Sequence, residues 1–343
     1  MPSNSTKILL LTTLVGGMLI SVSSNSWFGA WMGLEINLMS FIPLMSNVKN
    51  MYNTEASLKY FIVQVLASAT LLFMVVMKTM TEDLFSFEES TYTPMIICTP
   101  LLLKSGAAPL HWWFPGVMEG LSWENCALLM TVQKAAPLML MSYLIEMNIF
   151  TLSIILMSTI VGSIGGLNQT SMRKILTYSS INHTGWMLIA LTTSESLWMM
   201  YFLTYSTLAL TAVSAINLSG TSFINQTMMT NKESALIKFM MFTSLLSLGG
   251  LPPFLGFMPK WIVIQAMIIN NLAPLAAIVV VTSLITLYYY LKISYSSFLI
   301  LNMEPKWITS SHKNETTKNM MALILSSISL TGMMICTIIY NIN

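Results

Sequence analysis

The chain is organised into apolar runs of roughly twenty residues, separated by short charged or turn-forming stretches. An α-helix of about 20 residues spans the hydrocarbon core of a bilayer, whereas the strands of a membrane barrel are alternating segments of about ten. Charged residues make up only 8% of the 343 residues, against about 25% in soluble proteins. Such a chain cannot cover itself with a charged surface. We therefore expect an all-α polytopic membrane protein.

The pattern of apolar runs predicts about eleven transmembrane helices. The expected spans are residues 8–22, 26–46, 57–78, 94–115, 124–145, 149–167, 174–193, 196–218, 236–270, 272–297 and 318–340. The ninth is too long for one straight helix, since at 1.5 Å per residue it would reach roughly 50 Å. It contains Gly249-Gly250 and Pro252-Pro253, so we predict that it is broken in the middle.

Basic residues in the connections predict the orientation of the chain. If the connections alternate between the two sides, the side of the N-terminus receives eleven basic residues and the other side receives only Lys78. The eleven are Lys7, Lys49, Lys59, Arg173, Lys174, Lys232, Lys238, Lys292, Lys306, Lys313 and Lys318. We therefore expect the N-terminus on the negative side, the matrix or cytoplasm, and the C-terminus on the opposite side.

Several ionisable side chains fall at depths where lipid does not accommodate them. Glu35, Lys104 and Lys134 lie close to the centres of three predicted spans, and His183 lies at the centre of a fourth. Lys260 follows the predicted break of the ninth span. A charge at the centre of a membrane helix costs about 2.5–3.5 kcal/mol. We expect these side chains to face one another, or internal water, inside the helix bundle.

These residues have a structural and a functional interpretation. Glu35 and one lysine would suffice for a structural ion pair, and His183 alone is compatible with a hydrogen-bonded core histidine. The remaining lysines have no carboxylate, because no other acid lies inside a span. A buried amine without such a partner favours its neutral form and can bind and release protons.

Prolines near the lysines point to internal water. Pro109, Pro137 and Pro252 each leave a helix carbonyl without its usual donor at membrane depth, where water or a side chain must supply one. Kinks that serve packing alone are the alternative interpretation.

The first five predicted spans and the next five have a similar arrangement along the chain. Pro252 follows Pro109 by 143 residues, and shifting the first five spans by about that distance lands on the sixth to tenth. Because five is odd, the copies have opposite topology, as in many transporters whose interrupted helices form the transport site. We expect two inverted five-helix repeats, residues 1–147 and 148–297. A polar connection and a C-terminal transmembrane helix follow over 298–343.

Nothing in the sequence predicts redox, metal or nucleic-acid binding. The three cysteines, Cys98, Cys126 and Cys336, are isolated in apolar stretches, so no zinc or iron–sulfur site is expected. There is no nucleotide-binding GxGxxG after a strand, no flavin motif and no basic patch with interleaved aromatic residues. The 31 methionines suggest a genetic code that reads an isoleucine codon as Met, as many animal mitochondrial genomes do.

Several blocks of sequence resemble the antiporter-like membrane subunits of respiratory complex I, the NADH:ubiquinone oxidoreductase. They are Leu101–Pro115, Gly165–Thr170, Arg173-Lys174, Ser179–Trp186 and Leu248–Trp261, and the resemblance runs from about residue 24 to 295. It implies a location in the mitochondrial inner membrane, with the N-terminus on the matrix side and the C-terminus on the intermembrane-space side.

The resemblance also implies a proton path. Glu35 and Lys104 would be a carboxylate–lysine pair whose separation and reunion couples the subunit to its neighbours, and Lys134 would be the central relay. Lys260 would lie on the path toward the outer compartment or the next subunit. Sister subunits often carry a glutamate on the second broken helix, so the lysine here leaves the direction of the last transfer open.

His111 and His183 are implied as intermediate carriers along a water chain. The complex oxidises NADH and reduces ubiquinone, but no cofactor is expected in this chain. NADH, FMN, iron–sulfur clusters and ubiquinone would belong to other subunits. The expected partners are the other membrane-arm subunits, including antiporter-like sister subunits, and the lipid bilayer, with cardiolipin as a candidate lipid. No nucleic acid is expected.

Two other functions stay open at this point. A stand-alone cation/proton antiporter of the same ancestry would need a carboxylate at the membrane midplane to hold sodium, and only Glu35 qualifies. A structural membrane subunit with a silent relay would tolerate replacement of Lys134 by Met, whereas a pump subunit would not.

Overall fold

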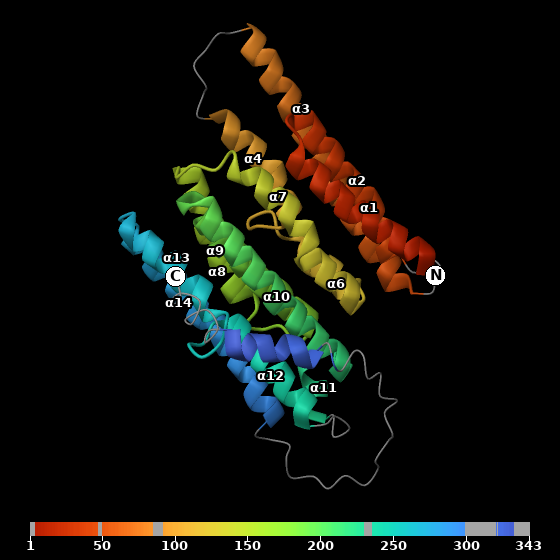
Figure 1. Ribbon diagram of the computed structural model, residues 1–343, viewed down its shortest axis with the longest axis vertical. Helices are drawn as coiled ribbons and strands as arrows, with labels where there is room; N and C mark the ends of the chain where they lie inside the picture. The colour runs from red at the N-terminus through yellow and green to blue at the C-terminus, as the bar shows by residue number, and fades with distance from the viewer. Residues whose placement is uncertain are drawn as a thin grey trace. The chain divides into compact units, whose positions relative to one another are not determined.

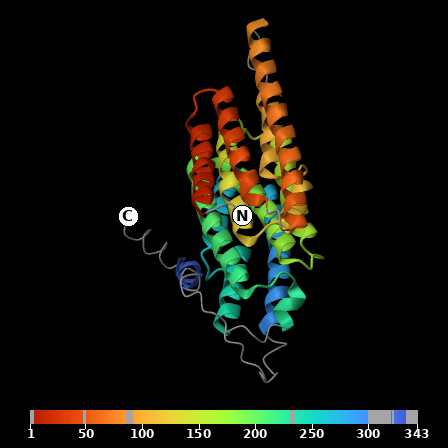
Figure 2. The same ribbon diagram turned by 90° about the vertical axis from the view of Figure 1, so that its right-hand side faces the viewer.

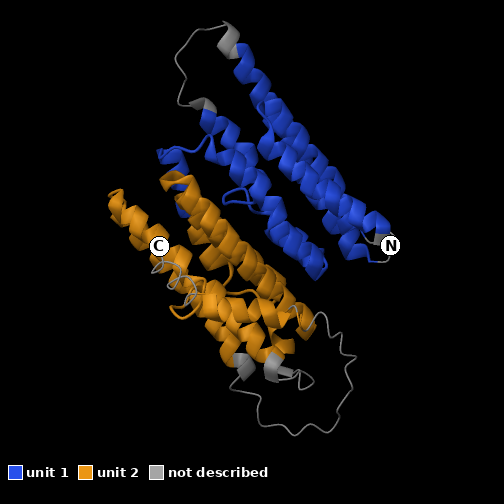
Figure 3. Ribbon diagram, in the orientation of Figure 1, with its two compact units in different colours: residues 1–158 blue, residues 159–343 orange. Residues whose placement is uncertain are grey.

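A computed structural model describes residues 4–46, 50–84, 92–229, 235–298, 320 and 322–332. Over these residues the chain folds into helices and short connections without a strand, and only Ser171 and Phe223 form an isolated antiparallel bridge. The all-α prediction is confirmed. The chain divides into two compact units, residues 1–158 and 159–343 (Figure 3).

Unit 1 contains the first seven helices of the described chain. They are α1 (Asn4–Ser23), α2 (Trp27–Met45), α3 (Met51–Leu84), α4 (Tyr92–Ser105), α5 (Trp113–Gly120), α6 (Trp123–Met130) and α7 (Val132–Ser142). α1 packs on α2 and α7, α2 packs on α3, and α4 packs on α3 and α7. Figure 2 shows α1, α2 and α3 running side by side. A Cβ atom on Gly33 would lie 2.5 Å from the backbone nitrogen of Ser21, so glycine allows the close crossing of α1 and α2.

Unit 2 contains the helices that follow α8 (Ile149–Gly165), within which the boundary between the units falls. They are α9 (Met172–Thr193), α10 (Glu195–Ser219), α11 (Ile224–Met229), α12 (Ala235–Gly249), α13 (Phe257–Ile269) and α14 (Ala273–Phe298) (Figure 1). α10 packs on α9, α12 and α13, and α14 packs on α12 and α13. Residues 322–332 are also helical, and the backbone carbonyl of Ser329 accepts a hydrogen bond of 3.2 Å from the Leu255 N–H.

Five helices of the described chain are long and apolar enough to cross a membrane by length and composition. These segments are Ser5–Ser23, Trp27–Met45, Met51–Met80, Glu195–Ser219 and Ala273–Tyr295. Shorter apolar helices are Pro94–Ser105, Ile149–Gly165, Ile237–Gly249, Phe257–Ile269 and Ala322–Gly332. The count of eleven spans and the division at 147/148 and 297/298 stay predictions. Most of the predicted connection and C-terminal span, with Cys336, lies outside the described residues.

Three predicted spans contain two helices each. The ninth is divided into α12 and α13, which confirms the predicted break. The fourth ends as a helix at Ser105 and resumes as α5 only at Trp113. The fifth is divided at Thr131, whose backbone (φ −109°, ψ −77°) departs from helical geometry, and the sequence did not predict this interruption.

Candidate functional site

The interruptions of the fourth and ninth predicted spans each begin at a glycine with positive φ. α4 is followed by Gly106 (φ 72°) and α12 is followed by Gly250 (φ 80°). Glycine adopts this left-handed conformation at little cost and commonly terminates helices. The sequence predicted the break of the ninth span from its glycines and prolines together. In the structure the glycines end both helices first, and the prolines lie in the non-helical stretch that follows.

The end of α4 places Lys104 in the interior of unit 1. Lys104 is 7% exposed. Neutral side chains cap the carbonyls of this last turn, because Trp113 Nε1 donates to the Leu103 carbonyl (3.1 Å) and Gln64 Nε2 to the carbonyl of Lys104 itself (3.5 Å). Its ammonium makes no hydrogen bond to the described residues and is therefore not used as a helix cap.

Lys134 lies in the first turn of α7, just after the interruption at Thr131. It is 2% exposed, and its ammonium lies 4.9 Å from the centre of the Phe114 ring. A cation facing an aromatic ring is attracted by the ring's quadrupole. The first predicted repeat thus buries two lysines, one at a helix end and one beside a helix interruption.

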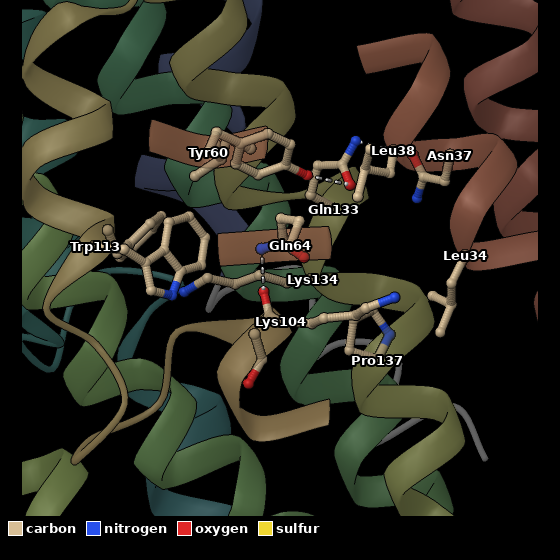
Figure 4. Close-up of a pocket in the computed structure, with 13 residues that line it drawn as sticks. Leu34, Asn37, Leu38, Tyr60, Gln64, Lys104, Trp113, Gln133, Lys134 and Pro137 are labelled. Carbon is tan, nitrogen blue, oxygen red and sulfur yellow. Dashed lines mark hydrogen bonds between the residues drawn. The ribbon is translucent and has the colours of Figure 1, made fainter. Parts of the chain in front are cut away.

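Both lysines line a small polar cavity inside unit 1 (Figure 4). Its lining includes Lys104 and Lys134 together with Asn37, Tyr60 and Gln133. It offers about 20 Å³ to the centre of a water molecule, and one water needs roughly 10–15 Å³. The cavity is therefore both polar and large enough to hold a water molecule.

Three of the side chains that line the cavity are joined by hydrogen bonds. Gln133 Nε2 donates to Asn37 Oδ1 (2.8 Å), and the Tyr60 hydroxyl donates to Gln133 Oε1 (3.3 Å). Asn37 comes from α2, Tyr60 from α3 and Gln133 from α7. These hydrogen bonds therefore tie the helix of Glu35 to the helix of Lys134.

Glu35 does not form the ion pair that the resemblance implied. It is half-buried on α2 and close enough to Lys104 to interact electrostatically. By contrast, Lys59 and Glu55 form a salt bridge of 2.6 Å on the surface of α3. The Oε2 atom of Glu35 is buried without a hydrogen-bond partner among the described residues. The two members of the expected pair are thus separated in this structure.

His111 lies in the connection between α4 and α5. It is half-exposed, outside the lining of the cavity, and its Nδ1 lies 3.2 Å from the carbonyl of Pro109. Among the described residues no group of three His, Cys, Asp or Glu side chains is arranged to hold a metal ion.

In unit 2 the break in the ninth span positions Lys260. Its side chain is 6% exposed and reaches back from α13 to donate a hydrogen bond to the Gly249 carbonyl at the end of α12 (2.9 Å). The ammonium also lies 6.0 Å from the centre of the Trp186 ring. Unlike Lys104, this lysine itself caps the interrupted helix.

His183 lies in a buried polar region of unit 2. Its ring is 8% exposed, and its Nδ1 lies 2.9 Å from the hydroxyl of Tyr201 on α10. The Tyr205 ring lies 5.0 Å from it, centre to centre. His183 thus has an uncharged side chain, the Tyr201 phenol, at hydrogen-bond distance.

Sequence reasoning missed the uncharged partners Asn37, Tyr60, Gln133 and Tyr201. Each is a polar side chain inside a predicted span, and that was the available signal. A single amide or phenol costs far less in a membrane than a charge, so it did not stand out against the lysines.

Comparison with known proteins gives consistent results. The family model described as "NADH:quinone oxidoreductase/Mrp antiporter, TM" matches residues 24–286. A protein of Anopheles gambiae named NADH-ubiquinone oxidoreductase chain 2 is 49% identical over 333 residues, which cover 97% of this chain and 97% of the relative. A protein of Papio hamadryas with the same name is 38% identical over 302 residues, 86% of each chain.

Solved structures share the fold. A chain of respiratory complex I from Thermus thermophilus with bound aureothin is similar with a TM-score of 0.83 and 22% identity, covering 97% of this chain and 79% of that chain. A chain of the Mrp complex from Dietzia sp. has a TM-score of 0.73 and 20% identity, covering 87% of this chain and 61% of that chain.

Proposed function

Because the chain belongs to the NADH:quinone oxidoreductase/Mrp antiporter family of transmembrane proteins, we propose that it carries protons. In this proposal the multi-pass membrane protein acts as a subunit of an NADH-ubiquinone oxidoreductase. Its relatives with the name NADH-ubiquinone oxidoreductase chain 2 match nearly its whole length. In this proposal it lies in the mitochondrial inner membrane, with its N-terminus in the matrix and its C-terminus in the intermembrane space.

The observation that carries the proposal is the composition of the cavity in unit 1. Two buried lysines line it, and none of its 13 lining residues is acidic. Two buried amines beside space for water form an arrangement that can accept and release protons.

The proposed roles follow from where each residue lies. Glu35 acts on Lys104 across the gap between them, and Lys134 receives the proton on the other side of the cavity. In unit 2, His183 and Lys260 continue the path, and His111 serves as a carrier at the more exposed connection. Rotations of these side chains and internal water would carry each transfer.

The redox reaction takes place elsewhere in this proposal. Other subunits would hold NADH, FMN, the iron–sulfur clusters and ubiquinone, and would drive this chain through changes of charge or hydration along the membrane. Neighbouring membrane-arm subunits, including antiporter-like sister subunits, and lipids such as cardiolipin would cover its outer surface.

The test is Lys134→Met in the assembled complex, with Lys59→Met at the exposed Lys59–Glu55 pair as the matched control. We expect Lys134→Met to assemble normally and to lower NADH-driven proton translocation about tenfold, which corresponds to 1.36 kcal/mol in the barrier. The control should retain the rate of the unmodified complex. Normal proton translocation by Lys134→Met would show that the relay is silent and the subunit structural.

A second candidate, cation/proton exchange, is favoured by one observation, the buried Oε2 of Glu35 without a hydrogen-bond partner among the described residues. Replacing sodium by choline in the assay medium separates the two functions. Proton translocation that is independent of sodium supports the first proposal, and a strict sodium requirement supports the second.

A further inference from the structure

Tyr201 lies between two ionisable side chains of unit 2, His183 and Lys260. Its side chain is 1% exposed, and its hydroxyl lies 2.9 Å from His183 Nδ1. The ring of Tyr201 also stacks on the ring of Trp186, with centres 6.5 Å apart and planes at 12°. The Trp186 ring in turn faces the Lys260 ammonium. A single phenol therefore contacts His183 directly and Lys260 through one aromatic ring.

A phenol suits a histidine that changes its protonation state. The hydroxyl of tyrosine both donates and accepts, so it can donate to Nδ1 of neutral imidazole and accept from Nδ1–H of imidazolium. The hydrogen bond is thus kept in both states, and the ring of His183 does not have to turn. The hydrogen bond at one ring nitrogen thus fixes the orientation of the imidazole.

Two polar side-chain atoms of α9, close to His183 in the sequence, are buried. Asn182 Oδ1 and Trp186 Nε1 have no hydrogen-bond partner among the described residues. Asn182 and Trp186 are four residues apart on α9 and so share one face of the helix. Buried polar groups of this kind are normally satisfied, often by an ordered water. Asn182 directly precedes His183 in the chain, and Trp186 follows it by about one helical turn.

We propose that Tyr201 is a positioning residue of the proton path: through Nδ1 it holds the His183 ring in one orientation in both protonation states, so that His183 can take up and release a proton without turning. This inference rests on the proposed function and extends it to a residue that carries no charge. The ionisable groups around the pair include Tyr205 on α10, Lys260 on α13 and Tyr290 on α14.

The test is Tyr201→Phe in the assembled complex, which keeps the ring that stacks on Trp186 and removes only the hydroxyl. The control is Tyr288→Phe, which removes a hydroxyl from a ring that is 60% exposed on α14. We expect Tyr201→Phe to lower the number of protons moved per NADH oxidised and to change the pH profile of coupled turnover. Tyr288→Phe should do neither. A loss of packing alone would lower electron transfer and proton translocation together and leave their ratio unchanged.

A double-mutant comparison with His183→Gln decides whether the two residues act together. We expect Tyr201→Phe to add no further loss in the His183→Gln background. Additive losses, or a normal proton ratio in Tyr201→Phe beside an impaired His183→Gln, would overturn the inference while leaving the role of His183 intact. Lys134→Met tests the proposed function independently of both.

A measurement on the unmodified complex covers the case in which Tyr201→Phe does not assemble. An experimental map of the assembled complex should place the Tyr201 hydroxyl within hydrogen-bond distance of His183 Nδ1. A separation beyond about 3.5 Å overturns the inference without any variant.

Discussion

The ammonium of Lys260 donates a 2.9 Å hydrogen bond to the carbonyl of Gly249, the last residue of α12. In a continuous helix this carbonyl would accept from residue 253, but Pro253 has no N–H to donate. A cation at a helix C-terminus is also favoured by the helix dipole. Lys260 therefore has a structural task as a cap besides its proposed task as a proton carrier.

Substitutions at Lys260 should separate these two tasks. Lys260→Met leaves the buried Gly249 carbonyl without a donor, which costs about 1–3 kcal/mol. We expect less of this subunit in the assembled complex and earlier loss on heating, measured on native gels. Lys260→Arg retains a charged donor, but a guanidinium does not release its proton. We therefore expect this variant to assemble and to fail in proton translocation. If Lys260→Arg translocates normally, the residue is a cap only.

Glu35→Gln should impair coupling more than assembly. Because Glu35 makes no salt bridge, its charge is not needed to hold α2 in place, and glutamine has nearly the same shape. Without the carboxylate, the electrostatic influence on Lys104 disappears. We expect coupled NADH turnover to fall several-fold while native gels show the normal amount of complex.

The matched control for Glu35 is Glu55→Gln on the exposed surface of α3, where the loss of a surface ion pair costs at most about 1 kcal/mol. Normal turnover of a fully assembled Glu35→Gln complex would remove Glu35 from the coupling mechanism.

The positions of the charged residues could be predicted from sequence because lipid penalises a misplaced charge strongly. Lys104, Lys134, Lys260 and His183, which the sequence places inside predicted spans, are all buried. The break of the ninth span was also predictable, since Gly250 and two prolines stand together. These features depend only on chain length, hydropathy and local backbone rules.

Contacts between helices could not be predicted in the same way. Nothing in the pattern of one span shows that Gln133 meets Asn37 from a helix nearly a hundred positions earlier, or that Tyr201 meets His183. The interruption at Thr131 also has no proline or glycine to announce it. Even the separation of Glu35 from Lys104 depends on rotamers and on the packing of α2, which hydropathy does not encode.

Gln133→Leu should reduce proton translocation by changing the cavity rather than the charges. Leucine has nearly the same volume but removes both hydrogen bonds, to Asn37 and from Tyr60. The polar atoms left unpaired cost about 1–3 kcal/mol each, and a more apolar wall disfavours internal water. We expect a several-fold lower proton-to-NADH ratio and fewer ordered waters beside Lys134 in a high-resolution map.

Tyr60→Phe is the graded comparison for Gln133→Leu, because it removes only the longer of the two hydrogen bonds. Its effect should be smaller, at about 1 kcal/mol or less in stability. Equal effects of the two variants would mean that the amide of Gln133 has no particular role in the cavity.

Gly250→Ala should be more harmful than Gly220→Ala, although both glycines follow a helix with positive φ (80° and 66°). The left-handed conformation costs an alanine roughly 1–2 kcal/mol at either position. At Gly220 a Cβ atom would meet nothing within 4 Å, whereas at Gly250 it would lie 3.0 Å from Cδ and Nζ of Lys260. The added methyl group should therefore push the ammonium away from the Gly249 carbonyl. We expect both variants to lower thermal stability, measured as complex retained after heating, and only Gly250→Ala to lower protons moved per NADH. Equal proton ratios in the two variants would show that the position of Lys260 at the end of α12 does not matter for transport.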